Sequence, residues 1–334
     1  MPSRRTVLAA TAATGLALTA TPASASGSLK SLVDTQAARI TGYDTVAIGA
    51  FRGRETYSVR GDSIFQIGSI TKTFTAVLLA LSGGIDDPLT KRLPRRFPAP
   101  QGVTLAQLSS HTSGMPPLPP GLLEHPDFDE RDPYAHITDD FLIEALKRTT
   151  LVTPPGTAYQ YSNFGAGLLG LALARNYEAL VRHRITMPLR LDDTVLTLNP
   201  LQRRRKVQGY DANGKATPDW RLPLIPGAGA LYGTVDDLLR YMRAHLGDAP
   251  YRLRPALDLV QRPRFDINPQ AKVGLGWHFF TLPSGRTVTF HDGGTGGFTS
   301  LALFSPKDNT GVSIIVNKFN GNLLEHGAEL LESL

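Results

Sequence analysis

The sequence predicts an α/β (α+β) protein in which an antiparallel sheet, flanked by terminal helices, is interrupted by a mainly helical inserted region. Three observations indicate this class. Short apolar runs typical of strands gather near the two ends of the chain, at about residues 27–65 and 268–334. Between them, residues 66–267 show mostly helical apolar spacing and long loops. Hydrophobic residues make up 41% of the 334, which is enough for one large core.

Residues 1–25 have the features of an export signal. Arg4 and Arg5 form a twin-arginine start, residues 9–20 are mildly apolar, and Ala23-Ser24-Ala25 matches an A-x-A cleavage site. The apolar stretch is too short for a stable membrane span. We therefore expect export without stable membrane insertion, to a secreted or extracytoplasmic location, with association to the cell wall as an option. The alternative is a cytoplasmic protein with an unstructured Ala/Thr-rich tail, which the A-x-A site disfavours.

A helix and a β-hairpin are expected next. Helical apolar spacing predicts a helix over residues 28–41, whereas residues 45–51 and 55–59 have the pattern of strands. Arg52-Gly53 lies between the two strands and indicates the hairpin turn.

Ser69 and Lys72 are the first candidates for chemistry. The extended stretch 63–67 leads into residues 73–81, which are apolar enough for a buried helix, so Ser69 lies where an extended segment becomes a helix. Three residues apart, the two side chains share one face of the first turn. A hydroxyl beside an amine can act as an activated nucleophile. Alone, the S-x-x-K pattern is short and common, and the alternative is a Ser that only caps the helix, with Lys72 in solvent.

Residues 115–136 are rich in Pro and acidic residues and predict an exposed loop. Asp127, Asp129 and Asp132 within it suggest a metal loop. Their spacing lacks the Gly and the distal Glu of an EF-hand, so we predict a solvated loop and no metal site.

The remaining elements follow from apolar periodicity and from the positions of turn residues. Helices are expected at residues 138–147, 165–174, 235–246 and 323–334, and strands at residues 273–280, 287–291, 298–304 and 312–316.

Composition excludes several kinds of site. The sequence has no Cys, which excludes disulfides, thiolate metal sites and a Cys nucleophile. Much of the net charge of +6 comes from two clusters, at residues 91–96 and 203–206, without interleaved aromatic residues. We interpret both clusters as solvated surface and expect no nucleic-acid partner.

Two further stretches carry the groups that an acylated Ser requires: a proton donor for the leaving group and donors aimed at the oxyanion. Tyr161-Ser162-Asn163 follows a Pro-Gly turn and precedes a helix. His291-Asp292-Gly293-Gly294 ends a predicted strand. A backbone amide near Gly294 can approach an oxyanion because no side chain blocks it. The amide of Ser69, at a helix N-terminus, is the expected second donor.

The three motifs S-x-x-K, Y-x-N and H-x-G, in this order, resemble those of the serine β-lactamase and penicillin-binding protein superfamily. Because its second motif begins with Tyr, the sequence resembles the class C β-lactamase and D-alanyl-D-alanine carboxypeptidase branch. The resemblance implies a β-lactamase/transpeptidase-like fold, with residues 26–334 as one catalytic domain. Further stretches that look like family blocks are residues 85–89, 108–114, 155–157, 274–277 and 291–298.

The resemblance also implies a role for each site residue. Ser69 would be the acylated nucleophile and Lys72 would accept its proton. Tyr161 would relay a proton to the leaving group, and Asn163 would orient the acyl side chain and Lys72. His291 would form the third wall and help to keep Tyr161 partly anionic.

The same resemblance assigns the oxyanion and substrate-binding positions. The amides of Ser69 and Gly294 would form the oxyanion hole, and Asp292 and Gly293 would line the substrate. His111 lies in a block that is a structural turn in the family, so it receives no catalytic role.

Two departures from the family pattern bear on the substrate. His291 replaces the Lys usual in β-lactamases, and Asp292 stands where Thr or Ser often helps to bind a carboxylate. We expect a secreted serine hydrolase that acts through an acyl-enzyme on amide or ester bonds, D-Ala-D-Ala carboxypeptidase-like and β-lactamase-related, without metal or cofactor. Its partner would be a small molecule or a peptidoglycan-type peptide, and the protein would be a monomer.

Other readings of the same sequence stay open. An esterase, a D-aminopeptidase or a transacylase of the same fold would tolerate Asp292 better than a β-lactamase. From another class, a non-catalytic penicillin-binding sensor or wall-binding protein would keep the fold and lose deacylation.

Overall fold

The computed structural model of the chain describes residues 27–319 and 322–334. The export signal predicted at residues 1–25 lies outside the described residues. Within the described part, none of the helices has the length and apolar character that a membrane crossing requires.

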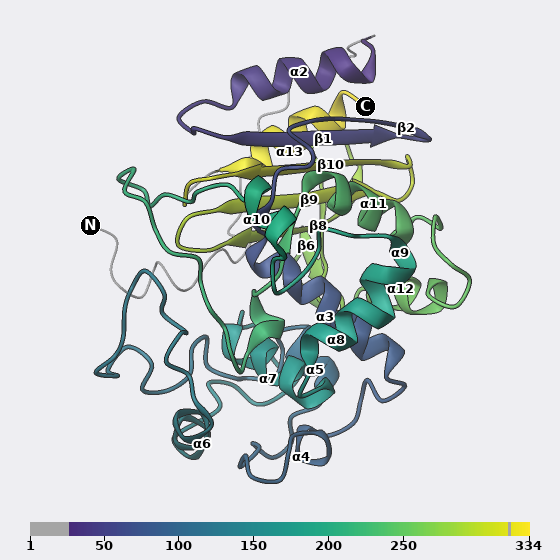
Figure 1. Ribbon diagram of the computed structural model, residues 1–334. Helices are drawn as coiled ribbons and strands as arrows, with labels where there is room; N and C mark the ends of the chain where they lie inside the picture. The colour runs from purple at the N-terminus through teal and green to yellow at the C-terminus, as the bar shows by residue number, and fades with distance from the viewer. Residues whose placement is uncertain (1–26, 320–321) are drawn as a thin grey trace.

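An eight-stranded sheet organises the described chain (Figure 1). All neighbouring strands pair antiparallel, which confirms the predicted type of sheet. Strands from the N-terminal and C-terminal parts of the chain pair with each other near one edge of the sheet, since Val46 lies opposite Val316. In spatial order the strands are β2 (Glu55–Val59), β1 (Val46–Arg52), β10 (Thr310–Val316), β9 (Thr299–Ser305), β8 (Thr287–Gly294), β7 (His278–Thr281), β6 (Ala271–Val273) and β5 (Phe265–Asn268).

Helices cover both faces of this sheet (Figure 1). The terminal helices α2 (Leu29–Arg39) and α13 (Leu323–Glu332) lie on one face and bury a cluster that includes Leu29 and Leu331. α11 (Val235–His245) lies on the other face, above a larger core shared with the inserted region.

The inserted region is mainly helical, as predicted. A second sheet there has only two short strands, β3 (Phe65–Gln66) and β4 (Tyr232–Gly233). Its helices are η1 (Gly68–Ile70), α3 (Thr71–Leu81), α4 (Leu89–Arg92), α5 (Leu105–Ser109), α6 (Asp139–Lys147), α7 (Asn163–Leu173), α8 (Tyr177–Val181), η2 (Arg182–Thr186), α9 (Met187–Leu189), α10 (Pro200–Arg205), η3 (Pro226–Ala228), α11 and α12 (Arg254–Val260).

Three predicted helices begin where a hydroxyl side chain caps the first turn. Thr138 caps α6 and Thr234 caps α11, each accepting a backbone N–H three residues on. Ser162 caps α7 in the same way, so this helix starts at Asn163, two residues earlier than predicted. The cap places Asn163 in the first turn, and this start matters for the site.

Two strand predictions were wrong in their bounds. Residues 273–280, predicted as one strand, form β6 and β7, which fold back on each other around a turn at Gly274–Trp277. Gly276 has φ +71°, and a Cβ there would lie 2.8 Å from the carbonyl oxygen of Lys72, so this turn packs onto the start of α3. Strand β8 continues past His291, because Gly293 and Gly294 still pair with Ser300 and Thr299.

The prediction of a solvated loop at residues 115–136 was also wrong in part. Asp132 is only 5% exposed, because its carboxylate accepts hydrogen bonds from the backbone and the side chain of Arg221. Met115, Leu122 and Tyr134 are fully buried. The loop is therefore packed onto the inserted region. Its sequence does not indicate this, because Arg221, the partner of Asp132, is remote in sequence.

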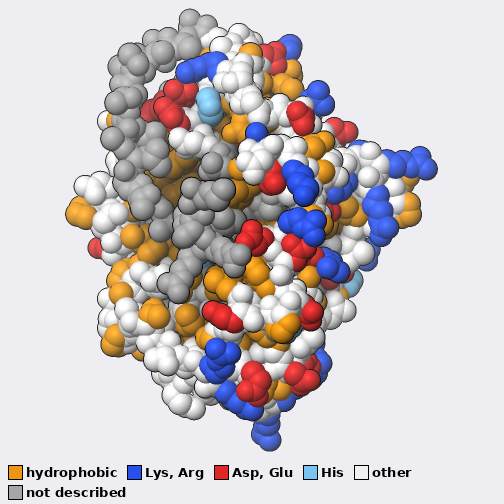
Figure 2. Space-filling model, turned by 90° about the vertical axis from the view of Figure 1, so that its left-hand side faces the viewer, with side chains coloured by type: hydrophobic (Ala, Val, Ile, Leu, Met, Phe, Trp, Pro, Cys, Tyr) orange, Lys and Arg blue, Asp and Glu red, His pale blue; other side chains and the backbone are white. Residues whose placement is uncertain are grey.

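Charges of both signs are interspersed on the molecular face in Figure 2, where Lys and Arg lie among Asp and Glu. The two basic clusters follow this pattern. Lys91 and Arg92 both pair with Asp87, at 2.8 and 2.7 Å. In the second cluster, Arg205 pairs with Asp193 at 2.5 Å and Lys206 with Asp219 at 2.7 Å.

Candidate active site

Ser69 lies in η1, a single 3₁₀ turn between β3 and α3. Gly68 before it has φ +49°, and a Cβ at Gly68 would come within 2.7 Å of the backbone nitrogen of Gly294. Only Gly can hold this conformation at so close an approach. The turn that carries Ser69 is thereby seated directly on the end of β8.

Lys72, in the first turn of α3, is 3% exposed and makes three contacts. Its Nζ lies 2.8 Å from Ser69 Oγ, 2.8 Å from Asn163 Oδ1 and 2.6 Å from the carbonyl oxygen of Ala228. Burial lowers the pKa of Lys72 to about 7, although the negative charge of Asp292 acts in the opposite direction. A large fraction of the amine is therefore neutral near pH 7.

The three contacts determine what a neutral Lys72 can do. Asn163 Oδ1 and the Ala228 carbonyl can only accept hydrogen bonds, so they take the two N–H groups of the neutral amine. The remaining tetrahedral position of Nζ is its lone pair, and the third neighbour is the hydroxyl of Ser69. In this state Ser69 donates to Lys72, which is the geometry of a nucleophile beside its base.

Tyr161 completes the group around Ser69. Burial raises the pKa of Tyr161 well above the usual 10, the Ser69 hydroxyl acts in the opposite direction, and the charge of Asp292 adds a further increase. The phenol is therefore a neutral proton donor at neutral pH. Burial also lowers the pKa of His291 well below 6.5, so this imidazole is neutral. The expectation that His291 helps to keep Tyr161 partly anionic does not hold in this environment.

Asn163 is held from two sides. Its Oδ1 accepts from Lys72, and its Nδ2 donates to the hydroxyl of Tyr134 at 3.3 Å. Tyr134 and Ala228 had no role in the sequence interpretation. A carbonyl acceptor such as Ala228 leaves no trace in side-chain patterns, so residue types alone do not indicate it.

Strand β8 forms the opposite wall. His291 is 1% exposed, and its Nδ1 lies 2.5 Å from the carbonyl oxygen of Asp292, so Nδ1 carries the proton. The ring of His278 on β7 packs against it, with ring centroids 5.3 Å apart. Asp292 is half-buried, and its charge raises the pKa values of Lys72, Tyr159 and Tyr161. The wall thus places a carboxylate near the catalytic group.

The backbone amides of Ser69 and Gly294 lie where η1 meets β8. A Cβ at Gly293 would lie 3.0 Å from Ser69 N and 2.2 Å from the carbonyl oxygen of Ile67. A Cβ at Gly294 would meet only the ring of Phe319, at 3.5 Å. The structure therefore brings all eight predicted site positions together at one junction of η1, α3, α7 and β8.

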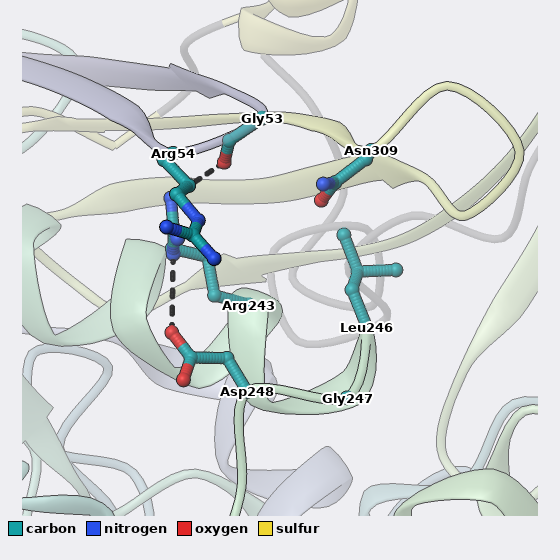
Figure 3. Close-up of a pocket in the computed structure, with 7 residues that line it drawn as sticks. All are labelled: Gly53, Arg54, Arg243, Leu246, Gly247, Asp248 and Asn309. Carbon is teal, nitrogen blue, oxygen red and sulfur yellow. Dashed lines mark hydrogen bonds and ion pairs between the residues drawn. The ribbon is translucent and has the colours of Figure 1, made fainter.

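A separate surface pocket lies at the other end of β9 from this junction (Figure 3). Arg243 in it donates to the carbonyl of Gly53 at 2.7 Å and contacts Asp248 at 3.4 Å. None of the predicted site residues lines it, and we assign it no part in the reaction. The lining residues are Gly53, Arg54, Arg243, Leu246, Gly247, Asp248 and Asn309.

Comparison with known proteins identifies the family. A model of the β-lactamase family matches residues 31–332. The chain belongs to the β-lactamase family. A D-alanyl-D-alanine-carboxypeptidase/endopeptidase, AmpH, of Escherichia coli (strain K12) is 31% identical over 283 residues, which is 77% of this chain and 71% of that protein. A β-lactamase of the same organism is 26% identical over 309 residues, 78% of this chain and 77% of that protein.

Solved structures of this family show the same fold. A class C β-lactamase superposes with a TM-score of 0.78 at 21% identity, covering 92% of this chain and 96% of that chain. A β-lactamase/D-alanine carboxypeptidase from Pseudomonas syringae superposes with a TM-score of 0.77 at 20% identity, covering 90% and 97%. The predicted fold class and the family resemblance are confirmed, and the chain is a serine hydrolase of the β-lactamase fold.

Proposed function

We propose that this β-lactamase-family hydrolase cleaves D-Ala-D-Ala-type peptides through an acyl-enzyme on Ser69. The observation that carries the proposal is the set of contacts around Lys72. Two acceptors occupy its N–H groups and leave its lone pair for the Ser69 hydroxyl. The 31% identity to a D-alanyl-D-alanine-carboxypeptidase/endopeptidase supports the substrate class.

The proposed reaction moves protons among three side chains. Ser69 Oγ attacks the carbonyl carbon as its proton passes to Lys72, and the amides of Ser69 and Gly294 stabilise the oxyanion. Tyr161 gives its proton to the leaving group and regains one from the Lys72 ammonium. Water then attacks the acyl carbon and loses a proton to this pair, and the Ser69 oxygen leaves with a proton. The resting state is restored with no net proton gained or lost by the enzyme.

A second substrate class is favoured by Asp292. A carboxylate on this wall repels the free carboxylate of a penicillin or of a terminal D-Ala. Esters and D-amino-acid amides have no such group at the leaving side. Hydrolysis by an esterase or a D-aminopeptidase, or acyl transfer, is therefore the alternative activity of the same Ser69 centre.

The proposal also includes the processing, the location and the oligomeric state of the protein. Residues 1–25 would be removed on export, and residues 26–334 would act outside the cytoplasm as one monomeric catalytic domain. The A-x-A site at Ala23-Ser24-Ala25 supports this processing.

A four-substrate panel tests the proposed function: a D-Ala-D-Ala peptide, a D-amino-acid amide, a p-nitrophenyl ester and a chromogenic cephalosporin, each with the wild-type chain and Ser69→Ala. We expect multiple turnovers of at least one substrate by the wild type, and none above the uncatalysed rate by the variant. Full activity in Ser69→Ala would overturn the role of Ser69. A stable wild-type adduct without turnover would favour the sensor or wall-binding protein instead.

A further inference from the structure

His111 follows the C-terminus of α5 in a backbone conformation that is uncommon for residues other than Gly. Its φ is +57°, in the left-handed region that suits Gly or Asn at the end of a helix. If this position served only to terminate α5, a Gly would adopt the same backbone conformation with less strain. The side chain of His111 is 1% exposed, so it is buried despite the strain. Such strain at a buried side chain indicates a task for that side chain.

The contacts of His111 show where this task lies. Its carbonyl oxygen accepts the backbone N–H of Gln160 at 2.7 Å, and its Nδ1 accepts the backbone N–H of Ser162 at 3.2 Å. The two residues that flank Tyr161 are therefore both bonded to one residue. Because Nδ1 accepts, the proton of this neutral imidazole lies on Nε2.

The ring of His111 also touches Tyr161 itself. The two ring centroids are 4.3 Å apart, with an angle of 31° between the planes. Tyr161 is only 9% exposed, and Lys72 Nζ lies 5.0 Å from its ring centroid. His111 therefore contacts both the ring of Tyr161 and the backbone on either side of it.

We propose that His111 is a positioning residue for Tyr161, bonding the backbone on both sides of it and packing on its ring so that the phenol hydroxyl stays on Ser69. The inference rests on the proposed function, in which Tyr161 protonates the leaving group. It goes beyond the turn-forming role that the family block implies. A displacement of about 1 Å at a reacting group can reduce a rate about 100-fold.

Leaving-group dependence separates positioning from mere folding. An alkyl ester needs a proton on its departing alkoxide, whereas p-nitrophenolate departs without one. Two esters of the same acid, one ethyl and one p-nitrophenyl, therefore report on Tyr161 through the ratio of their kcat/KM values. A loss of folded protein lowers both values by the same factor and leaves the ratio unchanged.

Four variants, one of them Tyr161→Phe, are compared at temperatures below their thermal unfolding transitions. His111→Gly suits the left-handed backbone and removes the ring, and His111→Asn suits the same backbone and keeps an acceptor near the position of Nδ1. The matched control is His245→Asn, which removes another buried ring. His245 contacts the Tyr241 carbonyl at 3.0 Å and accepts from Trp277 Nε1 at 3.1 Å.

We expect His111→Gly to lower kcat/KM about 100-fold on the ethyl ester but only about 10-fold on the p-nitrophenyl ester. His111→Asn should recover a part of the ethyl-ester loss, and His245→Asn should keep the wild-type ratio. An unchanged ratio in His111→Gly overturns the proposal, provided that Tyr161→Phe changes the ratio. If Tyr161→Phe also leaves the ratio unchanged, the role of Tyr161 in the proposed function fails, and the proposal fails with it.

Discussion

The two walls that meet at Ser69 differ in how completely their polar groups are paired. On the α3 side, Lys72 is buried and makes three hydrogen bonds of 2.6–2.8 Å. On the β8 side, Nε2 of His291 is buried without a hydrogen-bond partner among the described residues, and Asp292 brings a negative charge to the wall. The difference suggests that the α3 wall determines the chemistry and the β8 wall determines the substrate.

The largest effect is expected on the α3 wall, at Lys72. Lys72→Met keeps the length and apolar stem of the side chain and removes the base, so we predict a fall in kcat of about 10³-fold or more. The change in thermal unfolding temperature should be small, because Met suits a buried site. Steady-state kinetics and a melting curve check both parts, and near-normal turnover by the variant would show that another group deprotonates Ser69.

A matched pair of glycines tests the junction between the walls. Gly293→Ala would place a methyl 2.2 Å from the Ile67 carbonyl and 3.0 Å from Ser69 N, and thus shift an oxyanion donor. We predict a loss of about 10² in kcat/KM for this variant, the size of one lost donor. Gly294→Ala meets only the Phe319 ring at 3.5 Å, so we expect a clearly smaller loss than for Gly293→Ala. Equal effects of the two substitutions would contradict the placement of the oxyanion hole.

Acid should lower the free energy of unfolding, because histidines are buried on the β8 side. Burial lowers the pKa of His278 to about 4 from 6.5. Between these values the unfolded chain binds a proton that the folded chain does not, so the free energy of unfolding falls as pH decreases from 6.5 to 4. His278→Gln, which keeps a partner for Tyr159, should remove about 3 kcal/mol of this loss. Denaturant unfolding at several pH values measures it, and an unchanged pH dependence in the variant would mean that His278 is protonated in the folded state.

The smallest effect is expected for substrate choice at Asp292. Asp292→Thr removes a charge that repels carboxylates, so we predict that activity on a carboxylate-bearing substrate rises about tenfold relative to a neutral ester. Asp292→Asn, which keeps the size and loses the charge, should give a change in the same direction. If neither variant alters the ratio, Asp292 does not face the ligand and the β8 wall does not select by charge.

Local sequence pattern predicts the site residues that lie close together along the chain. Ser69 and Lys72 share one face because they are three residues apart across the junction of η1 and α3, as their spacing predicts. The sheet and its terminal helices follow in the same way from apolar periodicity.

The parts that the sequence did not predict depend on contacts between remote segments. The Ala228 carbonyl that accepts a hydrogen bond from Lys72 is a backbone group 156 residues away. Asp132 is buried by Arg221, and β6 and β7 separate at Gly276 because that turn packs on α3. His111 received no catalytic role because its block is a turn in the family, and its contacts with residues 160–162 are made only in the folded chain.

The most direct test of the central claim is peptide-mapping mass spectrometry of the wild-type chain, stopped during turnover of a p-nitrophenyl ester at pH values from 5 to 9. We predict an acyl group on the peptide that contains Ser69, with an acylation rate that rises with pH through about 7, where Lys72 loses its proton. An acyl group on another residue, or acylation of Ser69 that does not change across this pH range, would contradict the account.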